Sequence, residues 1–276
     1  MLYEKINLKD NYEYLKNNDS EADLVCLIPH FLPEMNRQNE KRPSILICPG
    51  GGYSFCCERE GEPIAIHFME MGFNAYVLHY SVKAQHCYPL QLNEVAAAFD
   101  TIAKMEEEHH GDRQRIAIAG FSAGGHLAAH YSTAFDSDAV RENFKDSIRP
   151  MASILCYPVI TADERYSHKG SFENLLGEYP DSETAKKFSC ENLVKENTPT
   201  AFIWHTAEDN IVPVQNSLLY ANALSKHNIP FELHVYPRGG HGFSTADIVT
   251  SHSEFEEGKY VHNWLTSLKN WIKFML

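Results

Sequence analysis

Residues 115–129 read RIAIAGFSAGGHLAA. The apolar run at 115–119 predicts a buried strand, and residues 122–133 have the spacing of a helix. Between them, GFSAG matches the pattern G-x-S-x-G, in which a serine occupies a sharp turn from a strand to a helix. Such a turn exposes the serine hydroxyl, and the flanking glycines avoid a collision at the strained backbone. The segment therefore predicts Ser122 as a nucleophile, and the alternative is an ordinary tight turn without a chemical role.

A serine nucleophile needs a base and a group that orients the base, and two loops downstream of Ser122 contain both. The loop TAEDNIVP, which follows the predicted strand 201–205, contains Asp209. The loop PRGGHGF, which follows the predicted strand 231–236, contains His241. Ligands bind at the carboxyl ends of the strands in open α/β sheets, where all three residues are expected. We therefore predict Ser122 as nucleophile, His241 as base and Asp209 as the orienting acid.

Two other carboxylates compete with Asp209 for the orienting role. Asp163 follows the preceding predicted strand, and an orienting acid can lie one strand earlier, so Asp163 is the main alternative. Glu208 is adjacent to Asp209 in the sequence, and we expect its side chain to point the other way. The pattern favours Asp209 and leaves Asp163 open.

Four further histidines have structural explanations. His205 and His234 lie within predicted strands, where a hydrogen-bonded buried histidine is more common than a catalytic one. His126 and His130 are four residues apart on one predicted helix, so they could bind a metal ion. They lack the glutamate of an HExxH motif and an obvious third ligand. We therefore expect no metal, and no motif in the chain indicates another cofactor.

A run of glycines, CPGGGY at residues 48–53, directly follows the predicted strand 44–48. Three glycines let the main chain approach a ligand closely and offer N–H donors, as an oxyanion hole requires. In such sites a second donor is the amide of the residue after the nucleophile, which is Ala123 in this chain. The spacing fits neither GxxxxGK[ST] nor GxGxxG, so a phosphate-binding loop is not indicated. A purely structural glycine turn remains the alternative.

Strand and helix patterns alternate along the whole chain, which is typical of a parallel sheet with helical crossovers. Strands are predicted at 23–28, 44–48, 73–79, 115–119, 152–157, 201–205 and 231–236, and helices at 64–69, 90–108, 122–133, 214–227 and 256–275. Residues 158–200 are too many for a plain connection and contain two short helical patterns, at 172–177 and 183–188. We interpret this segment as a cap insertion within a single domain that spans residues 1–276.

Composition excludes several classes of partner. The 276 residues include 37 Asp and Glu against 24 Lys and Arg, a formal charge of −13, which argues against binding of nucleic acid or of an anionic membrane. No signal-peptide pattern opens the sequence and no apolar run could span a bilayer, so a cytoplasmic protein is expected. The seven cysteines follow no regular spacing, which suits free thiols in a reducing compartment. A redox role for the neighbouring Cys56 and Cys57 is the less favoured interpretation.

Together these motifs resemble the α/β-hydrolase superfamily. More narrowly, PGGGY, GFSAGGHLA, AEDNIVP and GGHGF resemble the bacterial esterase/lipase group that includes acetylxylan-esterase-like and hormone-sensitive-lipase-like enzymes, from about residue 43 to the end. The resemblance implies an α/β-hydrolase fold, with a mostly parallel central sheet and helices on both faces. It also implies a catalytic triad of Ser122, Asp209 and His241.

The same resemblance implies that the amides of Gly51, Gly52 and Ala123 form the oxyanion hole. Many lipases of the group have His-Gly-Gly-Gly, whereas this chain has Pro49 in place of that histidine. The substitution favours the carbohydrate-esterase-like branch over the lipases.

The sequence therefore predicts a serine carboxylic-ester hydrolase. We expect a small-molecule ester as substrate, with a short acyl group such as acetyl on a sugar or a xylo-oligosaccharide. The 12% of aromatic residues could supply stacking surfaces for sugar rings, although aromatic residues more often build the core. The alternatives are a peptidase, amidase or formamidase with the same triad, and a ligand-binding protein that has kept the fold and lost turnover. The sequence leaves open whether the chain forms a homo-oligomer.

Overall fold

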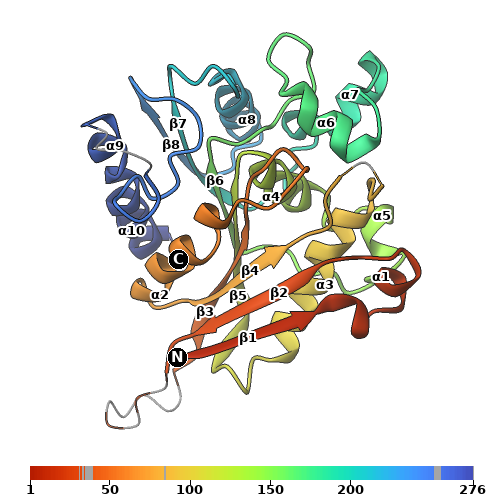
Figure 1. Cartoon of the computed structure of the whole chain (residues 1–276), viewed down its shortest axis with the longest axis vertical. Helices are drawn as coiled ribbons and strands as arrows, with labels where there is room; N and C mark the ends of the chain where they lie inside the picture. The colour runs from red at the N-terminus through yellow and green to blue at the C-terminus, as the bar shows by residue number, and fades with distance from the viewer. Residues whose placement is uncertain (31, 33, 35–39, 84, 252–255, 276) are drawn as a thin grey trace.

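A central sheet of eight strands organises the molecule (Figure 1). The computed structural model describes residues 1–276 except 31, 33, 35–39, 84, 252–255 and 276. The strands lie in the spatial order β1-β2-β4-β3-β5-β6-β7-β8. Strands β3 to β8 run parallel to one another, whereas β2 pairs antiparallel with both β1 and β4. The strands span Leu2–Asn7 (β1), Asp23–Ile28 (β2), Arg42–Cys48 (β3), Asn74–His79 (β4), Gly111–Phe121 (β5), Ala152–Cys156 (β6), Thr200–Thr206 (β7) and Phe231–Tyr236 (β8).

Helices cover both faces of this sheet. One face packs against α3, α4 and α8, and the opposite face packs against α2 and α10. The larger helices span Glu62–Glu70 (α2), Leu90–Lys104 (α3), Ala123–Ala134 (α4), Gln215–Lys226 (α8), Glu256–Val261 (α9) and Asn263–Met275 (α10), and two short ones span Glu13–Asn17 (α1) and Asp138–Arg141 (α5). A mostly parallel sheet between two helical layers confirms the predicted fold class.

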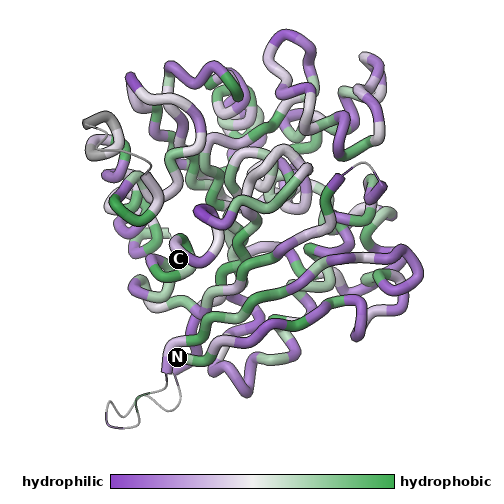
Figure 2. Tube along the Cα trace, viewed as in Figure 1, coloured by the Kyte–Doolittle hydropathy of each residue, from purple (hydrophilic) through white to green (hydrophobic). Residues whose placement is uncertain are grey.

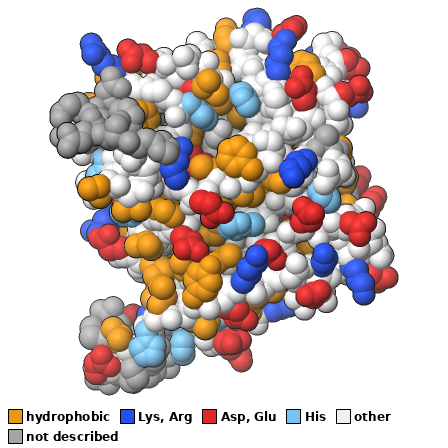
Figure 3. Space-filling view, viewed as in Figure 1, with side chains coloured by type: hydrophobic (Ala, Val, Ile, Leu, Met, Phe, Trp, Pro, Cys, Tyr) orange, Lys and Arg blue, Asp and Glu red, His pale blue; other side chains and the backbone are white. Residues whose placement is uncertain are grey.

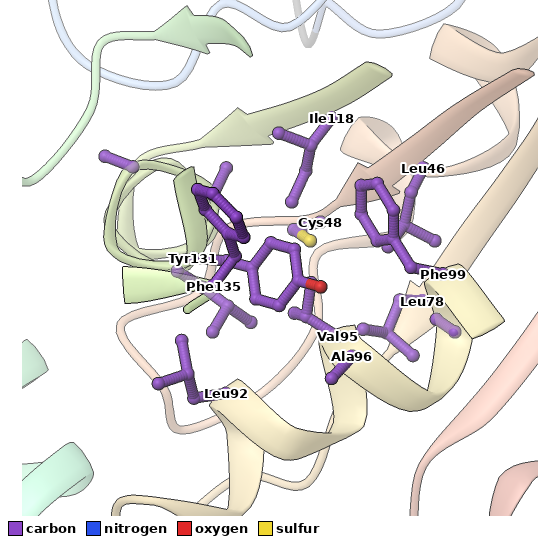
Figure 4. Close-up of a cluster of buried hydrophobic side chains, with 14 of the residues drawn as sticks. Leu46, Cys48, Leu78, Leu92, Val95, Ala96, Phe99, Ile118, Tyr131 and Phe135 are labelled. Atoms are coloured by element: carbon purple, nitrogen blue, oxygen red, sulfur yellow. The ribbon is translucent and has the colours of Figure 1, made fainter. Parts of the chain in front are cut away.

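The two hydrophobic cores follow from alternation along the strands. Successive side chains of a strand point to opposite faces, so a buried parallel strand is apolar on both sides. In β3, Leu46 packs toward α3 and α4, and its neighbours Ile45 and Ile47 pack toward α2. Figure 4 shows the first of these cores, in which the rings of Phe99 on α3 and Tyr131 on α4 lie 5.1 Å apart. Hydrophobic residues accordingly concentrate in the central strands of the chain trace (Figure 2).

Several elements differ from the sequence prediction, among them the extent of β5 (Gly111–Phe121 against the predicted 115–119) and the unpredicted helices α1 and α5. The helix expected at 90–108 ends at Lys104, because the run of three glutamates at 106–108 would place negative charge at the negative end of the helix dipole. The helix expected at 256–275 is divided at His262, whose ring is hydrogen-bonded to the carbonyl oxygen of Thr245 at 2.6 Å. Strand β1 was not predicted, because its residues are mostly exposed at the edge of the sheet.

Residues 158–200 connect β6 to β7 and contain two helices, Lys169–Leu176 (α6) and Ser182–Phe188 (α7). Helix α6 begins earlier than its predicted pattern, and α7 begins at an N-cap, where the Asp181 carboxylate accepts hydrogen bonds from two backbone amides. That this segment acts as a cap, and that residues 1–276 form one domain, stay predictions. None of the helices within the described residues is long and apolar enough to span a membrane.

Candidate active site

Ser122 occupies the turn between β5 and α4 in a strained conformation. Its backbone has φ 53° and ψ −118°, which non-glycine residues rarely adopt. The turn is tight enough to require glycine on both sides. A Cβ on Gly120 would lie 2.2 Å from the Gly124 carbonyl oxygen, and a Cβ on Gly124 would lie 2.1 Å from the Cys48 carbonyl oxygen. The turn therefore presents Ser122 at the carboxyl end of β5, next to the end of β3.

The structure brings Ser122, His241 and Asp209 together in one chain of hydrogen bonds. His241 Nε2 lies 2.7 Å from Ser122 Oγ, and His241 Nδ1 lies 2.6 Å from Asp209 Oδ2. Asp209 follows β7 and His241 follows β8, so three loops at one edge of the sheet supply the three side chains. A neutral imidazole that donates from Nδ1 to a carboxylate has Nε2 free to accept the serine proton. The arrangement has the geometry of a nucleophile, a base and an orienting acid.

Asp209 is held in place as an ionised carboxylate. Its Oδ1 accepts hydrogen bonds from the amides of Ile211 at 3.0 Å and Val212 at 2.9 Å. Burial alone would raise the pKa of Asp209, but hydrogen bonds from His205, His241 and Val212 hold that pKa well below its usual value. The carboxylate is therefore charged throughout the neutral range, as the orienting partner of a histidine should be.

Neither of the two rival carboxylates contacts His241. Asp163 makes a surface ion pair with Arg165, which lowers the pKa of Asp163 to about 2. Glu208 Oε2 lies 3.3 Å from the amide nitrogen of Gly239, from which it accepts a hydrogen bond. The geometry thus favours Asp209 over Asp163, and the catalytic roles of the three residues stay proposals.

The contacts of His205 fit a hydrogen-bonded buried histidine, and they include one with the proposed acid. It is completely buried, its Nδ1 lies 2.8 Å from Ser217 Oγ and its Nε2 lies 2.8 Å from the Val212 carbonyl oxygen. Because a carbonyl only accepts, Nε2 carries the proton, and it also lies 3.2 Å from Asp209 Oδ2. The signal that sequence reasoning did not use is the spacing of four residues between His205 and Asp209.

His126 and His130 lie inside the fold beneath the site. The ring of His126 bridges two segments: Nδ1 lies 2.9 Å from the Tyr53 hydroxyl and Nε2 lies 2.9 Å from the Phe188 carbonyl oxygen. His130 stacks on Tyr88 at a centroid distance of 5.6 Å. Burial lowers the pKa of His126 to about 4 and the pKa of His130 to about 3. In the described part of the chain, no three His, Cys, Asp or Glu side chains gather in a way that could hold a metal ion.

These buried histidines predict a loss of stability in mild acid. Each pKa is lower in the folded than in the unfolded chain, where it is 6.5, so protons bind the unfolded chain more tightly and stability falls as the pH drops below 6.5. From pH 7 to pH 5 the two should together remove about 4 kcal/mol of unfolding free energy. His130→Phe, which keeps the ring stacking, should lose about half as much, measured by urea unfolding at several pH values.

The control is His227→Gln at an exposed position, which should keep the pH dependence of the unsubstituted protein. An unchanged pH dependence in His130→Phe would mean that this histidine is not held neutral by burial.

The glycine loop after β3 is fixed from several directions. Its Gly50 amide donates to Glu60 Oε2 at 2.8 Å, and the Tyr80 hydroxyl donates to the Pro49 carbonyl oxygen at 2.7 Å. Among the described residues, no acceptor binds the amides of Gly51 and Gly52. Both residues line the cavity around Ser122, so their amides are candidate donors to a ligand.

Ala123 supplies a third candidate donor. It is the first residue of α4, and the first amides of a helix have no partner within the helix. The oxyanion role of Gly51, Gly52 and Ala123 stays a proposal, because it depends on where a bound substrate places its carbonyl oxygen.

Glu60 is a buried residue of the site that sequence reasoning missed. Its Oε1 accepts from the Tyr157 hydroxyl at 2.6 Å, and that hydroxyl accepts from the Ser244 amide at 2.9 Å, three residues beyond His241. Since Glu60 also holds Gly50, it joins the glycine loop to the histidine loop. Burial raises the pKa of Glu60, and its hydrogen bonds oppose that shift. Nothing in the local pattern EREGE distinguishes this glutamate from its charged neighbours.

Ser122 and His241 line a cavity of about 370 Å³. Gly51, Gly52, Cys57 and His168 of the segment 158–200 are among the other residues that line it. Cys56 and Cys57 are both free thiols. Burial raises the pKa of Cys57, and it raises that of Cys56 to about 12, so neither thiol is activated as a nucleophile.

The sequence is similar to a known protein family and to two curated proteins. A model of the BD-FAE family matches residues 31–224. The chain is 41% identical over 227 residues to endo-1,4-beta-xylanase B of Butyrivibrio fibrisolvens, a match that covers 80% of this chain and 35% of that protein. It is 32% identical over 257 residues to an acetylxylan esterase of Xylanibacter ruminicola, covering 91% of this chain and 49% of that protein. The chain thus spans half or less of the length of these curated relatives.

A solved structure is similar over its whole length. The acetyl ester-xyloside bifunctional hydrolase from Caldicellulosiruptor lactoaceticus superposes with a TM-score of 0.84 at 34% sequence identity. The superposition covers 98% of this chain and 96% of that one.

Proposed function

The chain belongs to the BD-FAE family, whose members are α/β-hydrolase esterases, and from this premise we propose that it is a serine esterase that removes short acyl groups, chiefly acetyl, from sugars. The observation that carries the proposal is the continuous chain of hydrogen bonds from Asp209 through His241 to Ser122, with both distances under 2.8 Å. No cofactor is required for this chemistry.

In the proposed reaction, Ser122 Oγ attacks the ester carbonyl carbon while His241 Nε2 accepts the serine proton. The carbonyl oxygen becomes an oxyanion, which the amides of Gly51, Gly52 and Ala123 stabilise. The tetrahedral intermediate collapses, the bond to the alcohol breaks, and His241 returns the proton to the leaving alcohol. A water molecule then attacks the acyl-enzyme in the same way and releases acetate and free Ser122.

Three observations support a small neutral ester as substrate. A cavity of about 370 Å³ lies near the lower end of the range for ligand pockets, about 300–1,000 Å³. Both charged side chains that line it, Arg59 and Glu60, already have partners within the protein. The names of the relatives, acetylxylan esterase and acetyl ester-xyloside hydrolase, place acetylated xylose derivatives among the first substrates to test.

A chain-length series tests the acyl preference. We expect kcat/KM to be highest for acetyl esters and to be at least about tenfold lower for octanoyl esters, since each misplaced methylene costs about 1–3 kcal/mol of transition-state binding. The measurement compares acetyl, butyryl and octanoyl esters of one alcohol, beside acetate release from acetylated xylo-oligosaccharides, with Ser122→Ala as the blank. A preference for the octanoyl ester would overturn the assignment to short acyl groups.

A further inference from the structure

The cavity around Ser122 has an apolar rim that the chemistry of acyl transfer does not use. Phe55 and Ile211 both line it, and their side chains are 56% and 51% exposed. Large apolar side chains that stay exposed beside a cavity often mark a binding surface. In the space-filling view, hydrophobic side chains and histidines gather in the upper centre of the face over the loop after β3 and α6 (Figure 3).

The glycine loop fixes Phe55 close to the proposed oxyanion donors. The amides of Ser54 and Phe55 both donate to the Gly51 carbonyl oxygen, at 3.0 and 3.3 Å. Gly51 has φ 128°, and a Cβ at this position would lie 2.0 Å from the Phe55 carbonyl oxygen and 3.2 Å from Phe55 Cδ2. The Phe55 ring therefore lies over Gly51, on the rim of the cavity that Ser122 also lines.

A polar side chain from the segment 158–200 also lines the cavity. His168 precedes α6, and its Nδ1 lies 2.8 Å from Ser171 Oγ. Its Cε1 lies 3.7 Å from the position of a Cβ on Gly52, and His168 lines the cavity beside that glycine. No described residue forms a hydrogen bond with the other ring nitrogen, Nε2. Burial, and the nearby charge of His241 when protonated, lower the pKa of His168, so its ring is neutral at pH 7 and Nε2 can donate or accept according to its tautomer.

We propose that Phe55, Ile211 and His168 form the subsite for the alcohol half of the ester, and that its occupant is a single sugar ring. A sugar ring has an apolar face of C–H groups and a rim of hydroxyls, so it can lie on Phe55 while one hydroxyl bonds to His168 Nε2. A hydroxyl both donates and accepts, and it therefore suits either tautomer. This inference rests on the proposed esterase function and adds the residues that recognise the sugar.

The occupant is a neutral ring because the charged groups at this wall are engaged. The Arg59 guanidinium donates to the carbonyl oxygens of Gly242 at 3.2 Å and Thr250 at 3.0 Å. The Glu60 carboxyl accepts from the Gly50 amide and the Tyr157 hydroxyl. Among the described residues that line the cavity, these two side chains carry opposite charges and both are hydrogen-bonded within the protein, so the wall favours neither an anionic nor a cationic alcohol.

The test compares two acetate esters in each variant, one with a sugar and one without. For acetylated xylose, Phe55→Ala should lower kcat/KM about tenfold, mainly through KM, and His168→Leu about three- to tenfold. For ethyl acetate, which has no ring to bind, both losses should stay below about threefold. His168→Gln, which restores a hydrogen-bonding group, should recover part of the loss on acetylated xylose.

Two controls and a binding measurement make each outcome decisive. Phe274→Ala on α10, 87% exposed, and His227→Gln should leave both substrates unaffected. Equal losses on the two esters, or none on acetylated xylose, would overturn the sugar subsite. Failure of the unsubstituted protein on both esters would instead refute the esterase function. In that case the subsite is tested by calorimetry of xylobiose binding to Ser122→Ala. Adding Phe55→Ala to this variant should weaken the binding of xylobiose about tenfold, and unchanged binding would overturn the subsite.

Discussion

Replacement of Ser122 by alanine is expected to lower kcat on acetate esters by about 10⁴- to 10⁶-fold, as loss of the nucleophile does in enzymes with such a triad. The nucleophile contributes the covalent step itself, so no other group of the site can compensate. The fold should not change, because alanine at φ 53° has the same backbone strain as serine and the lost hydrogen bond is a single one to His241. Initial rates and the thermal midpoint, measured on the same sample, separate the two effects.

Ser132→Ala is the matched control for this experiment. Ser132 lies ten residues further along the chain, on α4, is buried, and its hydroxyl has no hydrogen-bond partner in the described structure. The same substitution there should leave kcat unchanged. Near-normal activity of Ser122→Ala would show that another residue is the nucleophile and that the site works by different chemistry.

Asp209→Asn is expected to lower kcat by about 10³- to 10⁴-fold, the second largest effect. The asparagine side chain is nearly the same size, and the amides of Ile211 and Val212 hold its oxygen at the Oδ1 position. Its NH₂ group would then face His241 Nδ1 and favour the tautomer with the proton on Nε2, which cannot accept the proton of Ser122. The loss should therefore appear in kcat with little change in KM, measured by steady-state kinetics on an acetate ester.

Asp163→Asn completes this comparison, because Asp163 is the acid that the sequence left open. Its carboxylate is paired with Arg165 at the surface, and such a pair contributes little to stability. The substitution should change kcat less than about twofold, as is usual for a surface site. The reverse order of the two effects would identify Asp163 as the orienting acid.

Much of this architecture could be predicted because its signals are local. The motifs GFSAG, TAEDNIVP and PRGGHGF each directly follow an apolar strand, and parallel strands end at the same edge of a sheet. The proximity of Ser122, Asp209 and His241 follows from that rule without any knowledge of the tertiary structure. Seven of the eight strands were predicted for the same reason, since a buried strand carries its own apolar signature.

What could not be predicted depends on contacts between distant segments. Glu60 matters because Tyr157, 97 residues away, donates to it, and no pattern in the surrounding sequence shows that contact. The last helix is divided at His262, whose ring contacts the carbonyl oxygen of Thr245, 17 residues away. The apolar signature is absent from β1, so it forms a strand only because β2 offers it a pairing edge.

The segment between β6 and β7 has a consequence for how specificity can diversify. His168 and Asn174, which donates to the Gly52 carbonyl oxygen at 2.9 Å, both belong to residues 158–200, whereas the nucleophile, base and acid lie outside them. Of the three residues proposed to bind the sugar, His168 thus lies in a segment separate from the proposed nucleophile, base and acid, whereas Phe55 and Ile211 lie outside that segment. Exchanging this connection between homologues should therefore change the polar contact that His168 offers to the sugar, while Ser122, Asp209 and His241 stay in place.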